Sequence, residues 1–126
     1  MPEVRQLDRE YLPEEGVPDY PQYVERFAQA SERYKASLPP ARRPSRAYGA
    51  HPLAIADYYL PQGVGPHPAI LFVHGGYWKR ASRPARAFLA ERYNARGIAW
   101  INVGYPIVPD VSLETVMQHA GDGLAF

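Results

Sequence analysis

Apolar positions recur at helical spacing in the first third of the chain. Between residue 19 and a proline-rich stretch at 38–46, they form one stripe that comprises Tyr20, Tyr23, Val24, Phe27, Ala28, Ser31 and Tyr34. A return every three or four residues predicts an amphipathic α-helix. Asp19 suits its amino-terminal cap, with Gln22 three residues later as in a capping box, and Pro21 fits its first turn. We expect this helix to cover a hydrophobic core; a partner-binding helix is the alternative.

The segments on either side of this helix carry no regular pattern. Residues 1–18 contain three prolines and many charges, which predicts an extended or irregular lead-in. Residues 38–46 break the helix and predict a basic linker, and their three arginines (Arg42, Arg43 and Arg46) favour a solvated connector over an anion site. We therefore divide the chain into an N-terminal segment, 1–46, and the first part of a separate domain, 47–126.

Strands and helices alternate from Tyr48 onward. Strands are predicted at 54–60, 69–73 and 98–103, and helices at about 83–96 and from about Ser112. The unbroken apolar run at 69–73 is typical of a strand buried on both faces of a parallel sheet. Ser82 and Pro84 suit the start of the helix at 83–96, and Gly97 suits its end. This order predicts an α/β fold with a mainly parallel sheet and right-handed crossovers.

The last helical segment reaches Phe126 without a glycine, asparagine or proline stop signal. Three strands would also leave the apolar run at 69–73 with an open edge, which is a liability for solubility. We therefore expect the chain to be part of a larger domain and to be poorly soluble alone.

Composition excludes several classes of function. The chain has 126 residues, 46% of them hydrophobic, and a net charge of +1, which indicates a globular protein without a field for nucleic acid or an anionic membrane. No apolar run is long enough to span a membrane, and no secretory signal is visible. Cysteine is absent, which fits a cytoplasmic location, and the four histidines show no metal-binding spacing, so we expect neither metal nor cofactor.

One stretch carries candidate chemistry, namely His74, Gly75, Gly76, Tyr77 and Trp78. It follows the apolar run at 69–73 and precedes a helix, and α/β sheets bind ligands at the carboxyl ends of their strands. Two consecutive glycines let the backbone turn sharply and approach a ligand. Outward-facing N–H groups in such a turn can bind a developing oxyanion. A tight turn without function is the alternative.

This motif resembles the oxyanion loop of α/β-hydrolase esterases and lipases. The version His-Gly-Gly-Tyr-Trp is similar to the kynurenine formamidase (arylformamidase) branch and its esterase relatives. Further positions agree with that branch, namely Tyr48-Gly49, His51-Pro52, Asp57, Tyr59, Pro61 and Gly104-Tyr105. The resemblance covers residues 48–126 and implies the N-terminal part of an α/β-hydrolase sheet, preceded by an extra N-terminal helix.

The resemblance also implies roles for the loop residues. The N–H groups of Gly76 and Tyr77, shaped by Gly75, would form part of the oxyanion hole. His74 would support the loop by hydrogen bonding rather than act as the base. Trp78 would either pack beneath the loop or form a wall of the acyl pocket.

Charged residues around the motif have simpler interpretations. A solvated helix start explains Lys79, Arg80, Arg83 and Arg86, with a rim for a substrate carboxylate as the alternative. Asp57 and Asp110 fit a strand and the approach to a helix, and His119 fits a structural role.

The chain offers no nucleophile of the expected kind. None of its serines (Ser31, Ser37, Ser45, Ser82 and Ser112) stands in a Gly-x-Ser-x-Gly elbow. The resemblance implies that the nucleophile, acid and base come later, on strands that include one beside residues 69–74. We interpret the full-length protein as a serine hydrolase of small-molecule esters or aryl formamides, with this piece inactive alone and its oligomeric state not fixed by the sequence.

Two other readings remain beside the hydrolase. The first is a non-catalytic, degenerate hydrolase piece that acts as a binding module. The second is a nucleotide-binding domain, which the lack of a Gly-x-Gly-x-x-Gly or P-loop motif disfavours.

Overall fold

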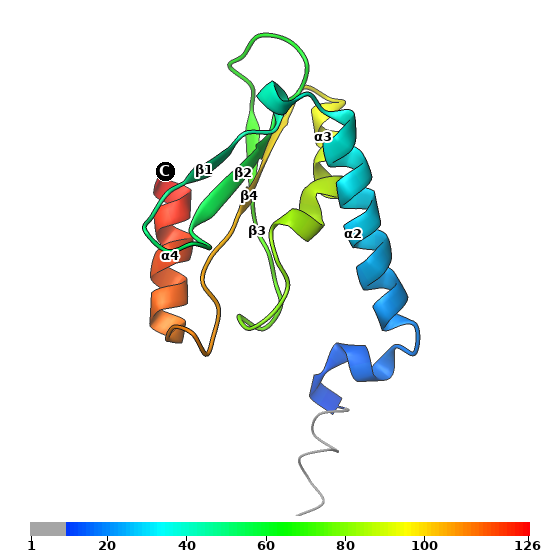
Figure 1. Ribbon diagram of the computed structural model, residues 1–126, viewed down its shortest axis with the longest axis vertical. Coiled ribbons are helices and arrows are strands. Elements are labelled where there is room, and N and C mark those ends of the chain that lie inside the picture. The colour runs from blue at the N-terminus through cyan, green and yellow to red at the C-terminus, as the bar shows by residue number, and fades with distance from the viewer. Residues whose placement is uncertain (1–9) are drawn as a thin grey trace, which may run out of the picture.

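A four-stranded sheet separates two helical layers (Figure 1). The computed structural model describes residues 10–126, so residues 1–9 of the expected lead-in lie outside the described residues. Helix α4 (Leu113–Ala125) lies against one face of the sheet, and helix α2 (Tyr20–Ser37) lies on the other side with the segments η3 (Pro84–Leu89) and α3 (Ala90–Asn94). The α/β class expected from the sequence is confirmed.

The sheet is mixed rather than mainly parallel, which corrects the sequence prediction. Its strands are β1 (Ser45–Ala47), β2 (Ile55–Tyr59), β3 (Ala69–Val73) and β4 (Ala99–Val103), in the order β1-β2-β4-β3. Only β3 and β4 pair in parallel, whereas β2 pairs antiparallel with both β1 and β4. The short connection between β1 and β2 permits only a hairpin, while the helical crossover after β3 allows a parallel partner.

The expected basic linker contains a strand, because β1 begins at Ser45 and extends the sheet beside β2. Two of its arginines form hydrogen bonds with backbone carbonyls. Arg42 Nε donates to the Leu60 carbonyl at 2.8 Å, and Arg43 Nε donates to the Leu38 carbonyl at 3.1 Å. The linker is thus not a solvated connector throughout. The division of the chain at residue 46 stays a prediction.

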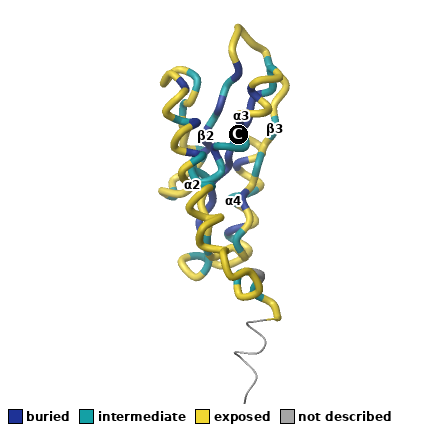
Figure 2. Tube along the Cα trace, turned by 90° about the vertical axis from the view of Figure 1, so that its right-hand side faces the viewer, coloured by how far each residue is buried: buried dark blue, intermediate teal, exposed yellow. Residues whose placement is uncertain are grey.

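Helix α2 is present where the periodicity predicts it, but it covers the core only with its carboxyl-terminal half (Figure 2). Ser31 and Tyr34 are buried, whereas Tyr23 and Val24 are each 46% exposed. The predicted capping box is wrong, since Asp19 accepts the Gln22 side-chain amide at 3.2 Å and caps no backbone N–H group.

The core lies between the sheet and the layer that contains α2. Its buried members are Tyr34, Leu38, Tyr59, Ala87, Ala90 and Trp100. Helix α2 packs mainly on η3, where Phe27 and Phe88 stack with ring centroids 5.1 Å apart. The Ser31 hydroxyl accepts the Phe88 N–H at 3.2 Å, which satisfies a buried polar group at this close contact.

The continuous helix expected at 83–96 is wrong. Its first part is the 3₁₀ segment η3, and only Ala90–Asn94 is α-helical. The Arg83 carbonyl accepts both the Arg86 N–H at 3.1 Å and the Asn102 side-chain amide at 2.9 Å, so a tertiary contact takes part in the first turn. Ser82 makes no cap, while Gly97 has the positive φ of 75° expected after a helix.

Strand β3 lies at the edge of the sheet and is not buried on both faces, which corrects that expectation. Its residues alternate between partly buried and exposed, and Leu71 and Val73 are 40% and 39% exposed. Helix α4 covers β4 instead, with Gly123 against Val103. Within residues 10–126, the outer edge of β3 has no neighbouring strand, as the sequence predicts.

Helix α4 starts where the sequence predicts, with the Ser112 hydroxyl accepting the Thr115 N–H at 3.2 Å. Among the helices of the described residues, none has the length and apolar character that a membrane crossing requires.

Candidate active site

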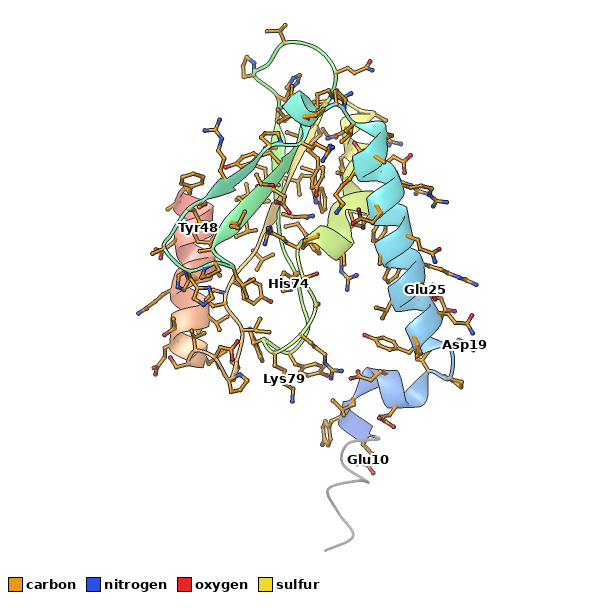
Figure 3. The ribbon with its side chains drawn as sticks, viewed as in Figure 1. Glu10, Asp19, Glu25, Tyr48, His74 and Lys79 are labelled. Carbon is orange, nitrogen blue, oxygen red and sulfur yellow. The ribbon has the colours of Figure 1, made fainter. Side chains whose placement is uncertain are left out.

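The loop that joins β3 to η3 has an unusual backbone. It starts at His74 and ends at Arg83, and in the view of Figure 3 it projects beyond the end of β3, between α4 and the amino-terminal half of α2. Tyr77, Trp78 and Ala81 have positive φ angles of 52°, 58° and 70°, which are uncommon for residues with a side chain. Gly76 has a φ of 133°, and a Cβ there would collide with the Arg80 carbonyl. Such a loop persists only where its surroundings fix it, and such strain clusters at functional sites.

The turn leaves two adjacent N–H groups without an acceptor. The Gly76 carbonyl accepts the N–H groups of Lys79 and Arg80 at 3.2 and 3.1 Å, which closes the turn. The N–H groups of Gly76 and Tyr77 donate no hydrogen bond to any residue of the described part, 10–126. Both residues line a cavity beside the loop. Two backbone donors in this setting can bind an oxyanion.

His74 lies beneath the loop and is 4% exposed. Its Nδ1 lies 3.0 Å from the Gly75 carbonyl, and since a carbonyl only accepts, Nδ1 carries the proton. The Tyr105 ring stacks on the imidazole with centroids 4.3 Å apart, and its hydroxyl donates to the His74 carbonyl. Burial lowers the pKa of His74, as do the nearby charges of Arg86 and Arg83, while the Gly75 hydrogen bond acts in the opposite direction. A neutral, enclosed imidazole fits the predicted supporting role.

The cavity beside the loop has a volume of about 710 Å³. This falls within the roughly 300–1,000 Å³ of typical small-molecule sites. Three separate parts of the chain line it: the segment before α2, the start of α2, and the loop with the beginning of η3. The lining residues are Glu14, Tyr20, Val24, Gly75, Gly76, Tyr77, Trp78, Arg80, Ala81, Ser82, Ala85 and Arg86. The aromatic side chains suit an apolar or aromatic ligand.

Trp78 and Tyr77 are each 50% exposed and line this cavity. Of the two alternatives for Trp78, this placement favours a cavity wall over core packing. Its carbonyl accepts the Val108 N–H at 2.8 Å, and the Tyr77 hydroxyl donates to the Tyr11 carbonyl at 3.0 Å. Both aromatic residues are therefore tied through hydrogen bonds to segments outside the loop.

The three arginines around the loop differ from a solvated helix start, whereas Lys79 is exposed, as such a start predicts. Arg80 pairs with Glu14, and Arg83 Nε lies 2.9 Å from Asp57 Oδ2. The Arg86 guanidinium lies over the Phe27 ring, 5.3 Å from its centroid. A rim for an anionic substrate would need unpaired cations, and of the arginines that line the cavity, only Arg86 has no carboxylate partner within residues 10–126.

The described residues hold no cluster of three or more histidine, aspartate or glutamate side chains that could bind a metal. His119 packs against Tyr48 and His51 with ring centroids 6.4 and 5.9 Å away, outside the cavity. Ser82 lines the cavity, but no hydrogen bond joins it to a histidine in the described part of the chain. The described chain thus presents donors for an oxyanion without an activated hydroxyl beside them.

Several residues of the site were not foreseen from the sequence. Tyr20 and Val24 belong to the stripe that the sequence predicts to cover the core, yet they line the cavity. Glu14 reaches Arg80 across 66 positions, and no local pattern signals such a pair. The sequence marks Tyr105 only as part of a similar loop, and its contact with His74 depends on the parallel pairing of β3 and β4.

The known proteins reported next are esterases or formamidases, and each matches part of the chain. No family model matches the chain. It is 34% identical to a kynurenine formamidase of Danio rerio over 63 residues, which are 49% of this chain and 22% of that protein. It is 31% identical to a probable isoprenylcysteine alpha-carbonyl methylesterase of Arabidopsis thaliana over 88 residues, which are 69% of this chain and 18% of that protein.

Solved structures agree with this relationship. A candidate thioesterase from a Silicibacter species superposes with a TM-score of 0.86 and 27% identity, over 94% of this chain and 45% of that one. A Pyrobaculum calidifontis esterase shares the fold, with a TM-score of 0.59 and 21% identity, over 99% of this chain and 41% of that one. The chain therefore spans less than half the length of these proteins, and over that part it is related to the esterases and formamidases of the α/β-hydrolase class.

Proposed function

We propose that this chain supplies the oxyanion loop, and one side of the substrate cavity, of a serine hydrolase that cleaves carboxylic esters or aryl formamides. The observation that carries the proposal is the pair of N–H groups at Gly76 and Tyr77, which lack an acceptor in the described residues and line a cavity. The relationship to esterases and a formamidase supports the class of reaction.

In the proposed reaction, a serine hydroxyl attacks the substrate carbonyl and its proton passes to a general base. The carbonyl oxygen gains negative charge as the bond forms, and the N–H groups of Gly76 and Tyr77 bind it. The leaving group departs as an alcohol or an arylamine, and water then hydrolyses the acyl or formyl ester of the serine. This chemistry needs no metal and no organic cofactor.

The nucleophile and base of this reaction are not assigned to any residue of the 126. No serine stands in a Gly-x-Ser-x-Gly elbow, and Ser82 has no histidine partner among residues 10–126. We therefore propose that the 126 residues alone hydrolyse nothing above background. The expected cytoplasmic location likewise stays a prediction.

The aromatic walls of the cavity suit the apolar or aryl part of a small-molecule substrate. Tyr20, Tyr77 and Trp78 provide flat surfaces, and the charges of Glu14 and Arg80 compensate each other. An aryl formamide and a general carboxylic ester both fit this description.

The first test is to read the coding sequence beyond the codon for Phe126 and to assay the encoded protein. A Gly-x-Ser-x-Gly elbow within a continued frame, with turnover of p-nitrophenyl acetate or an aryl formamide, supports the proposal. Steady turnover by the 126 residues alone, blocked by a serine-directed inhibitor, contradicts the proposed inactivity of this piece.

A glycine pair then tests the oxyanion loop in the active protein. Gly76→Ala forces the turn to rearrange and should lower kcat by about 10²–10³, the loss typical of one oxyanion donor. Gly97→Ala also introduces a side chain at a positive φ, but its Cβ contacts nothing within 4 Å and it lies outside the cavity. It should destabilise the fold and keep the wild-type kcat; equal effects of both changes on kcat refute the proposed role of the loop.

One observation favours a second function. The exposed edge of β3, with Leu71 and Val73 on its surface, could pair with a strand of another protein, as a non-catalytic binding module would. An encoded protein that shows no turnover, together with partner binding lost on Leu71→Lys, favours this alternative.

A further inference from the structure

Three polar side chains form a row across the sheet, level with Phe72 near the carboxyl end of β3. Ser45, Asp57 and Asn102 occupy paired positions on β1, β2 and β4, and paired residues of antiparallel strands point to the same face. Asp57 is 7% exposed and Asn102 is fully buried. Burying polar groups is unfavourable unless they are hydrogen-bonded or paired, so this row needs partners.

Each member of the row has its partner, and two of the contacts converge on Arg83. Asp57 Oδ1 accepts the Ser45 hydroxyl at 2.6 Å, and its Oδ2 forms an ion pair with Arg83 Nε at 2.9 Å. The Asn102 side-chain amide donates to the Arg83 carbonyl at 2.9 Å, and Asn102 Oδ1 accepts the Trp100 indole N–H at 2.6 Å. Arg83 is therefore held to the sheet by both its side chain and its main chain.

Arg83 is where the oxyanion loop ends. The other end, His74, is held by Tyr105, whose ring stacks on it and whose hydroxyl donates to its carbonyl. Between these two ends, Tyr77, Trp78 and Ala81 keep positive φ angles. A strained segment relaxes unless its surroundings determine its conformation. Two fixed ends provide that constraint.

We propose that Asp57 is a positioning residue for the oxyanion loop, which acts by holding Arg83 and thereby fixing the end of the loop that β3 does not fix. The expected effect on catalysis rests on the proposed function, whereas the contacts that hold the loop do not depend on it. Asp57 is not among the residues that line the cavity, so it contacts no substrate there.

The burial of the pair distinguishes it from an ordinary surface contact. The Arg83 and Asp57 side chains are 17% and 10% exposed, and the buried Arg83 Nε faces the Asp57 carboxylate as an ion pair rather than through a well-aligned hydrogen bond. Loss of the Asp57 charge would leave this cation uncompensated, and a buried ion that loses its partner moves toward water. Since Arg83 belongs to the backbone that ends the loop, its movement shifts the loop with it.

The test substitutes Asp57→Asn, which keeps the size of the side chain and an acceptor for Ser45 while it removes the charge. Amide hydrogen exchange of the chain is measured residue by residue, with Gly97→Ala as a control that is destabilised away from the loop. The Val108 N–H, bonded to the Trp78 carbonyl, reports on the loop, and the β4 amides report on global stability. We expect D57N to lower protection of Val108 by about tenfold or more beyond any change in β4, and G97A to change both alike.

Activity of the encoded protein provides the second readout. D57N should lower kcat by about tenfold and change KM less, because the misplaced donors act in the transition state, whereas the part of the cavity wall that Tyr20 and Val24 of α2 provide stays in place. Wild-type protection of Val108 in D57N, or a fall no larger than that of β4, overturns the positioning role whatever the activity. Loosening of the loop by D57N with no turnover in any variant upholds the anchor and refutes the proposed function instead.

Discussion

Removal of the Asn94 side chain should destabilise the fold more than any surface change, because this one amide joins three elements. Asn94 Oδ1 accepts the Tyr34 hydroxyl of α2 at 2.5 Å. Its Nδ2 donates to the Tyr59 carbonyl at the end of β2 at 2.9 Å, and to the Ile98 carbonyl at 2.8 Å. All of these groups lie at the carboxyl-terminal end of α2, where the helix meets the core.

The expected loss of unfolding free energy follows from the three hydrogen bonds of Asn94 and from the buried partners that its removal leaves unpaired. A buried neutral hydrogen bond contributes about 1 kcal/mol net, so Asn94→Ala should lower the free energy of unfolding by about 3 kcal/mol. Tyr34→Phe removes one of the three bonds and should cost about 1 kcal/mol. The double variant should cost about 1 kcal/mol less than the sum of the two, since both changes remove the same bond.

Urea unfolding followed by fluorescence measures this directly, since Trp100 is buried in the same core. The control is Gln29→Ala, which removes an exposed bond to Glu25 on α2 and should cost less than about 0.5 kcal/mol. The slope of the free energy against urea should not change among the variants. A loss in N94A no larger than in the control would show that apolar packing alone holds α2, and would refute the reasoning.

Two further predictions concern the titration of His74 and the packing of helix α4 on the sheet. The pKa of His74 is held below its ordinary 6.5. As the pH falls below this value, His74 is therefore protonated in the unfolded chain while it stays neutral in the native state. The urea midpoint should therefore be constant above about pH 6.5 and fall as the pH drops below it, and H74N should lack this fall; a flat profile in the wild type contradicts the burial of a neutral imidazole. On α4, Gly123→Ala should destabilise by about 1–3 kcal/mol because its Cβ collides with Val103, whereas Gly121→Ala meets no atom within 4 Å and should stabilise by up to about 1 kcal/mol; equal thermal midpoints would refute this packing.

The parts of the fold that local patterns encode were predictable. The stripe of α2, the apolar run of β3, the glycine turn after it and the start of α4 near Ser112 each depend on neighbouring residues, and all are present at the predicted positions. The antiparallel pairing of β1 and the 3₁₀ form of η3 depend on contacts between distant residues. In these two places, tertiary structure overrides the local preference.

The candidate site likewise has one part that the local sequence predicts and one part that depends on distant residues. His74, Gly75, Gly76, Tyr77 and Trp78 stand together in the sequence and lie together in the loop, as their spacing predicts. The opposite wall of the cavity comes from a helix whose exposed half has the same periodicity as its buried half. Periodicity identifies the stripe of a helix but not the surface that this stripe faces, so the wall could not be assigned from the sequence.

The division of the cavity between the region of α2 and the loop after β3 has a practical consequence for engineering. The residues of α2 that face the cavity are exposed and make no hydrogen bond to the loop backbone, within the part of the chain that the structure describes. A combinatorial library at Tyr20 and Val24 would therefore change the shape and polarity of the cavity while the turn at Gly76 keeps its geometry. Selectivity could then be screened independently of the chemical step.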